Sequence, residues 1–164
     1  MKIGDIVFYP MHGAGVIDGI ESNEVAGMKS SYYILKLPIG NLKLMLPVDN
    51  IEQLGLRKVI GKDKIAEIST VLRDKPDQTQ GSWNKRFQAI LDRMKTGDIL
   101  DVAAVARNLS LQYRKRKITS GERRLMELSR QILISDWFMP VKKHQKKLLN
   151  GLMILSVKVR RINS

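Results

Sequence analysis

The segment Ser31-Tyr32-Tyr33-Ile34-Leu35-Lys36-Leu37-Pro38-Ile39-Gly40-Asn41-Leu42-Lys43-Leu44-Met45-Leu46 decides the fold of the first part of this 164-residue chain. Residues 31–37 form an apolar run with two tyrosines that stops at a proline, which is typical of a β-strand. A second apolar run begins at Leu42, and the Gly40-Asn41 pair between the two runs favours a two-residue turn. The segment therefore predicts an antiparallel β-hairpin that turns at Gly40-Asn41.

Further strand signals lie before this hairpin. Residues 5–9 favour a strand that stops at Pro10, and Gly13 and Gly15 allow a tight turn before the next apolar run. Four or five short strands within about 55 residues are too few for a wide sandwich, and they most simply curl into a small barrel. We therefore predict a five-stranded antiparallel SH3-like or Tudor-like barrel over residues 1–60, which is only marginally stable alone.

After residue 60 the period of the apolar residues changes from two to about 3.6, which is typical of amphipathic helices. Thr119 and Glu122 have the spacing of a capping box and predict the start of a fourth helix. Residues 74–82 contain no large apolar side chain and predict an exposed loop just before Trp83. Pro140 predicts a break before a last helix with Leu148, Leu149, Leu152 and Leu155. The apolar stripes of the first four helices are Ile65, Ile68 and Leu72; Phe87, Ile90, Leu91 and Met94; Ile99, Val102, Ala106, Leu109 and Tyr113; and Leu125, Leu128 and Ile132.

The predicted fold class is α+β and multidomain, with the barrel in residues 1–60 and an all-α helical bundle in residues 61–164. The charge follows the same division. Residues 1–60 contain six Lys/Arg and six Asp/Glu, so the whole net charge of +13 lies in residues 61–164. This split predicts a protein partner for the near-neutral barrel and a polyanionic partner for the basic bundle.

Several other classes of protein are disfavoured by the composition. The 43% hydrophobic content excludes a wholly disordered chain, and the absence of cysteine excludes disulfides and thiolate metal sites. The N-terminus lacks the apolar stretch of a signal peptide, and no apolar run approaches the roughly 18 residues of a membrane span. We therefore expect a cytoplasmic protein that does not contact a membrane.

The sequence predicts no catalytic residue, no cofactor and no metal. The two histidines, His12 and His144, have no second ligand at the spacing of a metal site. The glycines after His12 lack the full dinucleotide-binding pattern, so a turn between strands is the simpler interpretation, and no Walker-type motif occurs. An enzyme with an unrecognised site is the least favoured alternative.

The basic residues of the second module are the strongest functional signal. A single lysine or arginine usually belongs to a solvated helix face, but a surplus of this size repels itself unless a polyanion or counterions screen it. We predict contacts with a nucleic-acid backbone at Lys85, Arg86, Arg114, Lys115, Arg116, Lys117, Arg123, Arg124 and Arg130.

Trp83 has two interpretations. Its helical spacing to Phe87, Ile90 and Met94 favours a tryptophan in the core. Its position after a polar loop and before Lys85 instead suits an apolar wedge that enters a minor groove while neighbouring cations hold the phosphates. The sequence leaves both open.

Several segments resemble, in the same order, those of the CarD-like bacterial transcription regulators. The first, Val7-Phe8-Tyr9-Pro10-Met11-His12-Gly13-Ala14-Gly15-Val16-Ile17, resembles the Tyr-Pro-x-His-Gly segment of that family. The resemblance extends to about Phe138, and a related N-terminal module occurs in the transcription-repair coupling factor, whose helicase motor is absent here. The other matching segments are Leu46-Pro47-Val48-Asp49-Asn50, Val71-Leu72-Arg73, Ser82-Trp83-Asn84-Lys85-Arg86-Phe87, Ser120-Gly121-Glu122-Arg123-Arg124 and Ser129-Arg130-Gln131-Ile132-Leu133.

The resemblance implies that the Tudor-like domain binds the β subunit of bacterial RNA polymerase through exposed sheet surface, at positions that match Asn23, Lys43, Met45 and Pro47. It also implies that the helical domain contacts double-stranded promoter DNA at the fork of the melted bubble. There, Trp83 would wedge into the minor groove and keep the open complex from collapsing. We expect a monomer that associates with the nucleoid through the polymerase.

The chain departs from the family pattern at three positions. Asn23 and Met45 stand where arginines are often found, and Gln88 replaces a basic residue that sometimes follows the tryptophan. The basic tail after Pro140 matches nothing that we identify. The alternative function is a general nucleic-acid-binding protein, associated with RNA or the nucleoid, whose residues 1–60 bind nucleic acid and ignore the polymerase.

Overall fold

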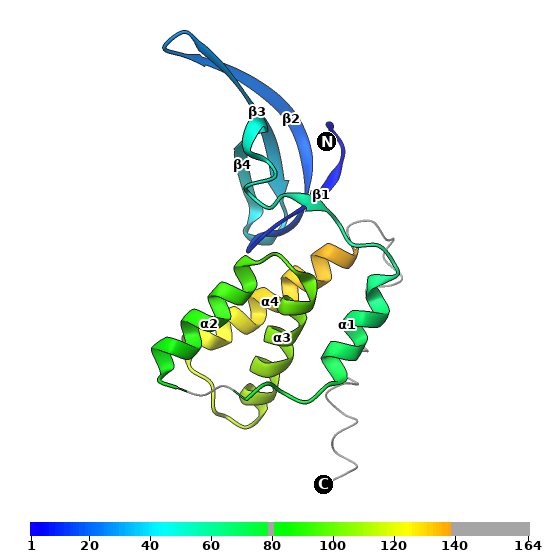
Figure 1. Cartoon of the computed structure of the whole chain (residues 1–164), viewed down its shortest axis with the longest axis vertical. Helices are drawn as coiled ribbons and strands as arrows, with labels where there is room; N and C mark the ends of the chain where they lie inside the picture. Colours follow the sequence, from blue (N-terminus) through cyan, green and yellow to red (C-terminus); the bar gives the residue numbers. More distant parts are fainter. Residues whose placement is uncertain (79–80, 139–164) are drawn as a thin grey trace.

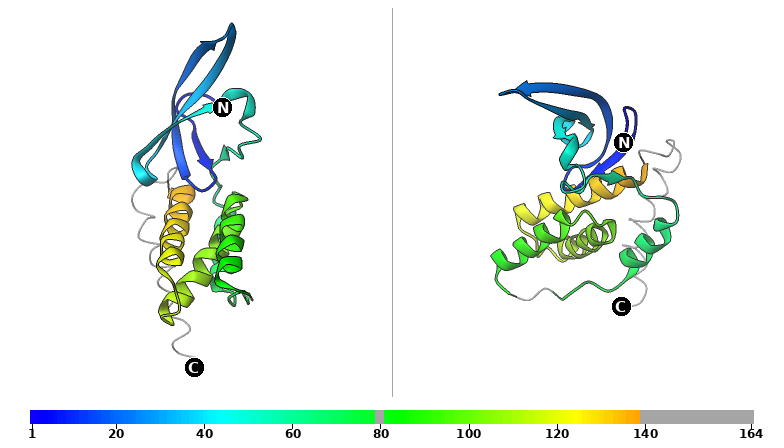
Figure 2. Two further views of the ribbon diagram at one scale, coloured as in Figure 1. Left: turned by 90° about the vertical axis from the view of Figure 1, so that its left-hand side faces the viewer. Right: turned by 45° about the horizontal axis from the view of Figure 1, so that its top comes forward.

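The computed structural model describes residues 1–78 and 81–138, and its first module is one antiparallel sheet. The strand order is β4-β3-β2-β1-β5, and Figure 1 and Figure 2 show the sheet curled above the helices. This arrangement confirms the predicted five-stranded antiparallel fold followed by helices. The strands are β1 (Ile6–Tyr9), β2 (Gly13–Val25), β3 (Met28–Leu37), β4 (Leu42–Pro47) and β5 (Arg57–Lys58).

The predicted hairpin joins β3 to β4, but its turn is longer than expected. Leu37 pairs with Leu42, so residues 38–41 form the connection, and Ile39–Asn41 is a short 3₁₀ turn. Gly40 and Asn41 both have a positive φ, of 74° and 51°, which Gly and Asn tolerate better than other residues. The prediction of a two-residue turn was therefore wrong, although the pair does reverse the chain.

Gly15 also lies elsewhere than predicted. It pairs with Val7 inside β2, and the turn between β1 and β2 falls on residues 10–12. A Cβ on Gly15 would lie 2.4 Å from the carbonyl oxygen of Lys36. Gly15 is thus required for the close approach of β2 to β3 and not for a turn.

The ends of β2 and β3 form an arm that projects away from the rest of the molecule (Figure 1). The pairing of β3 with β4 ends at the Tyr32–Pro47 pair, whereas β2 and β3 stay paired up to Val25 and Met28. Among the strands of the described part of the chain, none lies beside the arm as a third partner, so the arm is a two-stranded ribbon.

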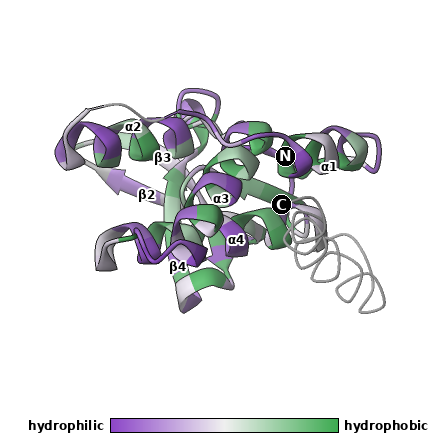
Figure 3. Ribbon diagram, turned by 90° about the horizontal axis from the view of Figure 1, so that it is seen from below, coloured by the Kyte–Doolittle hydropathy of each residue, from purple (hydrophilic) through white to green (hydrophobic). Residues whose placement is uncertain are grey.

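Within the described residues, four helices follow the sheet: α1 (Lys64–Arg73), α2 (Trp83–Lys95), α3 (Ile99–Arg114) and α4 (Ser120–Phe138). The first four predicted helices are thus confirmed. The central helix α3 contacts the other three, and Figure 3 shows it between them. Its apolar stripe is buried as far as Leu109, but Tyr113, the last residue of that stripe, is 43% exposed. The predicted last helix lies outside the described residues.

The two modules share part of a hydrophobic core. Phe8 of β1 is fully buried among the apolar side chains of the helices, and Val59 and Ile60 pack against the same cluster. A second cluster, which includes Ile17 and Leu35, lies within the sheet module. The sheet is therefore seated on the end of the helical layer where α4 ends (Figure 2).

Candidate nucleic-acid interface

Trp83 is the first residue of α2 and lies on the surface. Its side chain is 43% exposed, which excludes the core tryptophan that its helical spacing suggested. The indole ring stacks on Phe87 with 5.2 Å between the ring centroids and 27° between their planes. The indole N–H donates a hydrogen bond of 3.2 Å to Oγ1 of Thr119. The ring is therefore held on one side and open to a partner on the other.

Thr119 belongs to the predicted capping box of α4, and the structure confirms that box. The backbone N–H of Thr119 donates to Oε2 of Glu122 over 2.9 Å, and the N–H of Glu122 donates to Oγ1 of Thr119 over 3.3 Å. The Thr119 hydroxyl also donates to Glu122, whose side chain is almost fully buried. The Thr119 hydroxyl oxygen, which accepts the hydrogen bond from Trp83, is thus held in place by the capping box of α4. The sequence did not indicate this link between Trp83 and the start of α4.

Most of the predicted DNA-contacting residues lie at the same end of the helical module as Trp83. Lys85 is exposed on the first turn of α2, and Arg86 donates to the carbonyl oxygen of Gly81 over 3.0 Å. Arg114 is the exposed last residue of α3, and residues 115–117 follow it in the exposed connection to α4. Arg123 and Arg124 follow on the exposed first turns of α4. This end is remote from the sheet in Figure 1.

Arg130 is the exception among the predicted cations. It is half-buried and lies about 10 Å farther along α4 than Arg123, since a helix rises about 1.5 Å per residue. The structure therefore places Arg130 apart from the cations at the α3–α4 turn.

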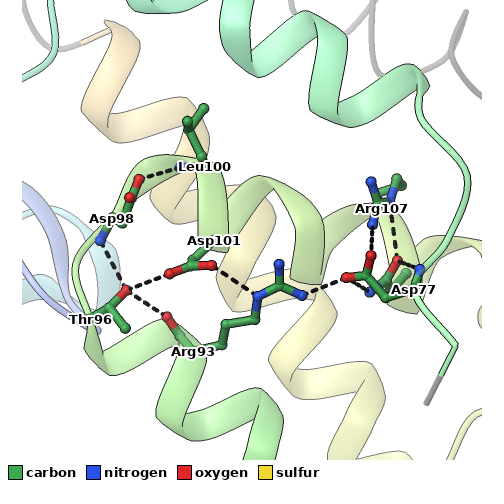
Figure 4. Close-up of polar contacts among 8 residues, drawn as sticks. Asp77, Arg93, Thr96, Asp98, Leu100, Asp101 and Arg107 are labelled. Atoms are coloured by element: carbon green, nitrogen blue, oxygen red, sulfur yellow. Dashed lines mark hydrogen bonds and ion pairs between the residues drawn. The ribbon is translucent and has the colours of Figure 1, made fainter.

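A polar network fastens the loop that leads to Trp83 (Figure 4). The carboxylate of Asp77 accepts from Arg93 of α2 and from Arg107 and Asn108 of α3, at 2.9 Å from Arg107 and 3.1 Å from Asn108. Arg107 is buried and also donates to the carbonyl oxygen of Val71. The hydrogen bond from Arg93 lowers the pKa of Asp77 below its ordinary value. Sequence reasoning identified the exposed loop but not this anchor.

The candidate polymerase-binding residues share one face of the sheet. Side chains directly opposite each other on paired strands point to the same face. Met45 pairs with Ile34, and the residues two positions before and after it, Lys43 and Pro47, pair with Lys36 and Tyr32. Asn23 pairs with Ser30, which lies two positions from Tyr32 and therefore on the same face. We call the surface of Asn23, Lys43, Met45 and Pro47 the outer face.

The outer face exposes an apolar side chain at its edge. Met45 is 46% exposed on β4, which is an edge strand of the sheet. Asn23 lies on the projecting arm, beyond the end of β4. The outer face thus combines one edge strand with one side of the arm.

The joint between the modules is built around a buried ion pair. Asp136 of α4 is fully buried and accepts from both terminal nitrogens of Arg57, at 2.7 and 3.2 Å. The Arg57 guanidinium also donates to the carbonyl oxygen of Gly97 and lies 3.9 Å above the centre of the Phe8 ring. Asp136 accepts a further hydrogen bond of 3.1 Å from the backbone N–H of Ile60. These contacts fix the sheet relative to α3 and α4.

The Tyr-Pro-x-His-Gly segment forms the rest of the joint. The backbone N–H of Ala14 donates to Oγ of Ser135 over 2.9 Å, and a Cβ on Gly13 would lie 2.5 Å from that same oxygen. The ring of His12 donates to the carbonyl oxygen of Pro10 and stacks on Tyr9, so it stabilises the turn. The segment therefore docks the sheet on α4.

Among residues 1–78 and 81–138, the acidic residues and His12 do not gather into any group that could hold a metal ion. None of the helices in these ranges has both the length and the apolar character needed to cross a membrane.

Comparison with known proteins assigns both modules. The CarD-like/TRCF RID domain matches residues 1–60, and the CarD C-terminal domain matches residues 67–152. A Bacillus subtilis (strain 168) protein named "Putative transcription factor YdeB" is 30% identical over 135 residues, which cover 82% of this chain and 88% of that protein. This chain therefore belongs to the CarD-like family.

Two solved N-terminal domains are also similar to part of the chain. CdnLNt from Myxococcus xanthus is 37% identical and covers 38% of this chain and 87% of its own, with a TM-score of 0.33. The 72-residue N-terminal domain of Myxococcus xanthus CarD is 29% identical and covers 35% of this chain and 77% of its own, with a TM-score of 0.30.

Proposed function

We propose that this protein, as a monomer, binds the β subunit of RNA polymerase through its outer face and stabilises the promoter open complex with Trp83. The observation that carries the proposal is the setting of Trp83, an exposed ring among cations and tied to Thr119. Membership of the CarD-like family supports a role in the regulation of transcription. The RID match over residues 1–60 supports contact with RNA polymerase.

A wedge of this kind is most effective at a DNA fork. Separating two stacked base pairs costs a few kcal/mol, but at the edge of a melted bubble part of that stacking is already lost. The hydrogen bond from Trp83 to Thr119 orders the ring before binding, which lowers the entropy lost in the complex. Base specificity is not required, because phosphate contacts and polymerase tethering position the ring.

The lifetime of the open complex tests the wedge. Trp83→Ala is expected to shorten that lifetime on a promoter template while the capture of purified RNA polymerase stays unchanged. Trp83→Phe keeps an aromatic ring and is expected to give an intermediate lifetime. An unchanged lifetime in Trp83→Ala would show that the ring is not a wedge.

The salt dependence of DNA binding tests the cations with a matched pair on one helix. Lys85 and Lys95 are both exposed, but they lie about 15 Å apart along α2, at opposite ends. The plot of log K against log salt concentration has a negative slope, and Lys85→Ala is expected to make that slope shallower by about 0.9. This is the value for one lost contact with a duplex phosphate. Lys95→Ala is expected to leave the slope unchanged, and equal slopes for both variants would contradict the assignment.

Capture of the polymerase β subunit tests the outer face. Met45 and Leu42 have similar exposure, 46% and 41%, and lie on opposite faces of β4 because they are three positions apart. Met45→Glu is expected to weaken capture, and Leu42→Glu is expected to leave it intact. If Met45→Glu instead weakens nucleic-acid binding and the wild type captures no polymerase, the general nucleic-acid-binding alternative holds.

A further inference from the structure

A cavity of about 630 Å³, open to solvent over much of its extent, lies at the turn between α3 and α4, next to Trp83. Three arginines and one tyrosine contribute to its wall, together with Ile118, Thr119 and Ser120, and none of the described residues that line it is a carboxylate. Cavities of about 300–1,000 Å³ are typical of small-ligand sites. A positive, partly aromatic wall selects a ligand that carries both an anionic group and a flat ring.

The aromatic part of the wall is Tyr113. Its side chain is 43% exposed although it continues the apolar stripe of α3. The guanidinium of Arg123 lies over the ring, with Cζ 5.3 Å from the ring centre. Arginine and tyrosine planes are the groups on which unpaired nucleobases stack in proteins that bind single strands.

Arg116 supplies charge from an unusual backbone position. The N–H of Lys117 donates to the carbonyl oxygen of Gln112, and the N–H of Arg116 donates to that of Tyr113, each over 3.0 Å. This pair of bonds is a Schellman motif, whose left-handed residue is usually glycine. Here that residue is Arg116, with φ of 54°. Residues with a strained backbone conformation cluster at binding sites, and Arg116 combines such a backbone with a place on the wall of the cavity.

We propose that this cavity binds one nucleotide whose base is unpaired. The base stacks on the exposed part of the Tyr113–Arg123 pair, and the phosphate binds Arg116. A paired base in a duplex has both faces covered by its neighbours, so only an unpaired nucleotide presents a face to the ring. The inference rests on the proposed function, because a Trp83 wedge at a fork leaves an unpaired base next to Thr119, which lines the same cavity.

The full chain tests the site with two DNA ligands of equal length, a blunt duplex and a fork with a single-stranded arm. Anisotropy of labelled DNA gives both affinities. Loss of one stacked base is worth about 1–3 kcal/mol, so Tyr113→Ala is expected to weaken fork binding about 5-fold to 150-fold and to leave duplex binding unchanged. Tyr113→Phe is expected to retain fork affinity, which separates stacking from folding.

Arg116 and Lys95 provide the matched charge variants. Arg116→Gly is expected to weaken fork binding more than duplex binding, whereas Lys95→Ala, at the far end of α2, is expected to change neither. Equal losses of fork and duplex binding in Tyr113→Ala, or no preference of the wild type for the fork, would overturn the proposal. The open-complex lifetime of Trp83→Ala is a separate readout, so failure of the wedge is distinguishable from failure of this site.

Competition identifies the source of the nucleotide. ATP is titrated into the complex of the wild-type chain with forked DNA. Displacement of the fork by ATP, absent in Tyr113→Ala, would support the site with a free nucleotide as a sufficient ligand. No displacement, with the Tyr113 dependence of fork binding retained, would support the site with the DNA strand as its ligand.

Discussion

Arg57 of β5 and Asp136 of α4 form a bidentate ion pair across the joint, in which the carboxylate is fully buried and lies 2.7 Å from Nη2. Both partners make further bonds, Arg57 to the carbonyl oxygen of Gly97 and Asp136 to the N–H of Ile60. The sheet therefore cannot rotate on the helices without exposing or orphaning these groups. If the outer face binds polymerase, this joint sets the position of Trp83 relative to it.

The first prediction concerns the free energy of unfolding. Asp136→Ala removes a fully buried acceptor and leaves the Arg57 guanidinium, which is partly exposed, and the Ile60 N–H without it, so about 1–3 kcal/mol is expected. Asp18→Ala breaks an ion pair with Lys36 of similar length, 2.9 Å, but both side chains are exposed, so about 0–1 kcal/mol is expected. Urea denaturation of the full chain measures both, and equal costs would show that the buried pair does not hold the joint.

The second prediction explains why the Tyr-Pro-x-His-Gly segment ends in glycine. Gly13 and Gly27 have nearly the same φ, 81° and 78°, so Gly→Ala costs about 1–2 kcal/mol of backbone strain at each. Only the Cβ on Gly13 meets other atoms, at 2.5 Å from Ser135 Oγ and 2.7 Å from Ile39 Cδ1. Gly13→Ala is therefore expected to be more destabilising than Gly27→Ala in urea denaturation. Equal losses of stability in the two variants would show that the Ser135 and Ile39 side chains can move away from the new Cβ without a cost in free energy.

Local signals in the sequence were sufficient for the helices and the capping box, because a 3.6-residue period and the Thr119–Glu122 spacing act within one element. They were insufficient where residues remote in the sequence meet. Arg57 and Asp136 are 79 positions apart, and nothing in the pattern around either residue indicates its partner. Tyr113 has the spacing of the apolar stripe of α3, but the end of α3 extends beyond the core. The periodicity therefore could not show that the Tyr113 side chain is exposed.

The third prediction concerns Thr119. Thr119→Ala removes the side-chain oxygen that caps α4 and accepts from Trp83, so it is expected to destabilise the chain by about 1 kcal/mol. The fluorescence of Trp83 is also expected to change, because its indole N–H loses its acceptor. Ser120→Ala, in the next exposed position, is the control and is expected to do neither. A Thr119→Ala variant with unchanged stability and fluorescence would contradict the coupling between the cap and Trp83.

The fourth prediction concerns pH. The pKa of Asp77 is lowered in the folded state, mainly by its hydrogen bond from Arg93. Its contribution to stability is therefore present above the unfolded pKa, about 3.9, and is lost as the pH falls through the folded value. The stability difference between wild type and Asp77→Asn is expected to be larger at pH 7 than below pH 3. Urea denaturation at both pH values measures it, with Asp49→Asn as the control, and a difference independent of pH would contradict the role of the Asp77 charge.

The last prediction separates stability from binding at Arg116. A non-glycine residue in the left-handed conformation, such as Arg116, costs about 1–2 kcal/mol of stability, which a change to glycine would recover. Glycine also has more freedom in the unfolded chain, and this freedom lowers stability by about 0.5–1 kcal/mol. Arg116→Gly is therefore expected to raise the free energy of unfolding by up to about 1.5 kcal/mol while it weakens fork binding. When a binding-site substitution weakens binding, damage to the fold is usually an alternative explanation. A variant that is more stable than the wild type but binds less well excludes that explanation. A variant less stable than the wild type would show that the Arg116 side chain contributes to the fold, and its backbone strain would then give no support to the nucleotide site.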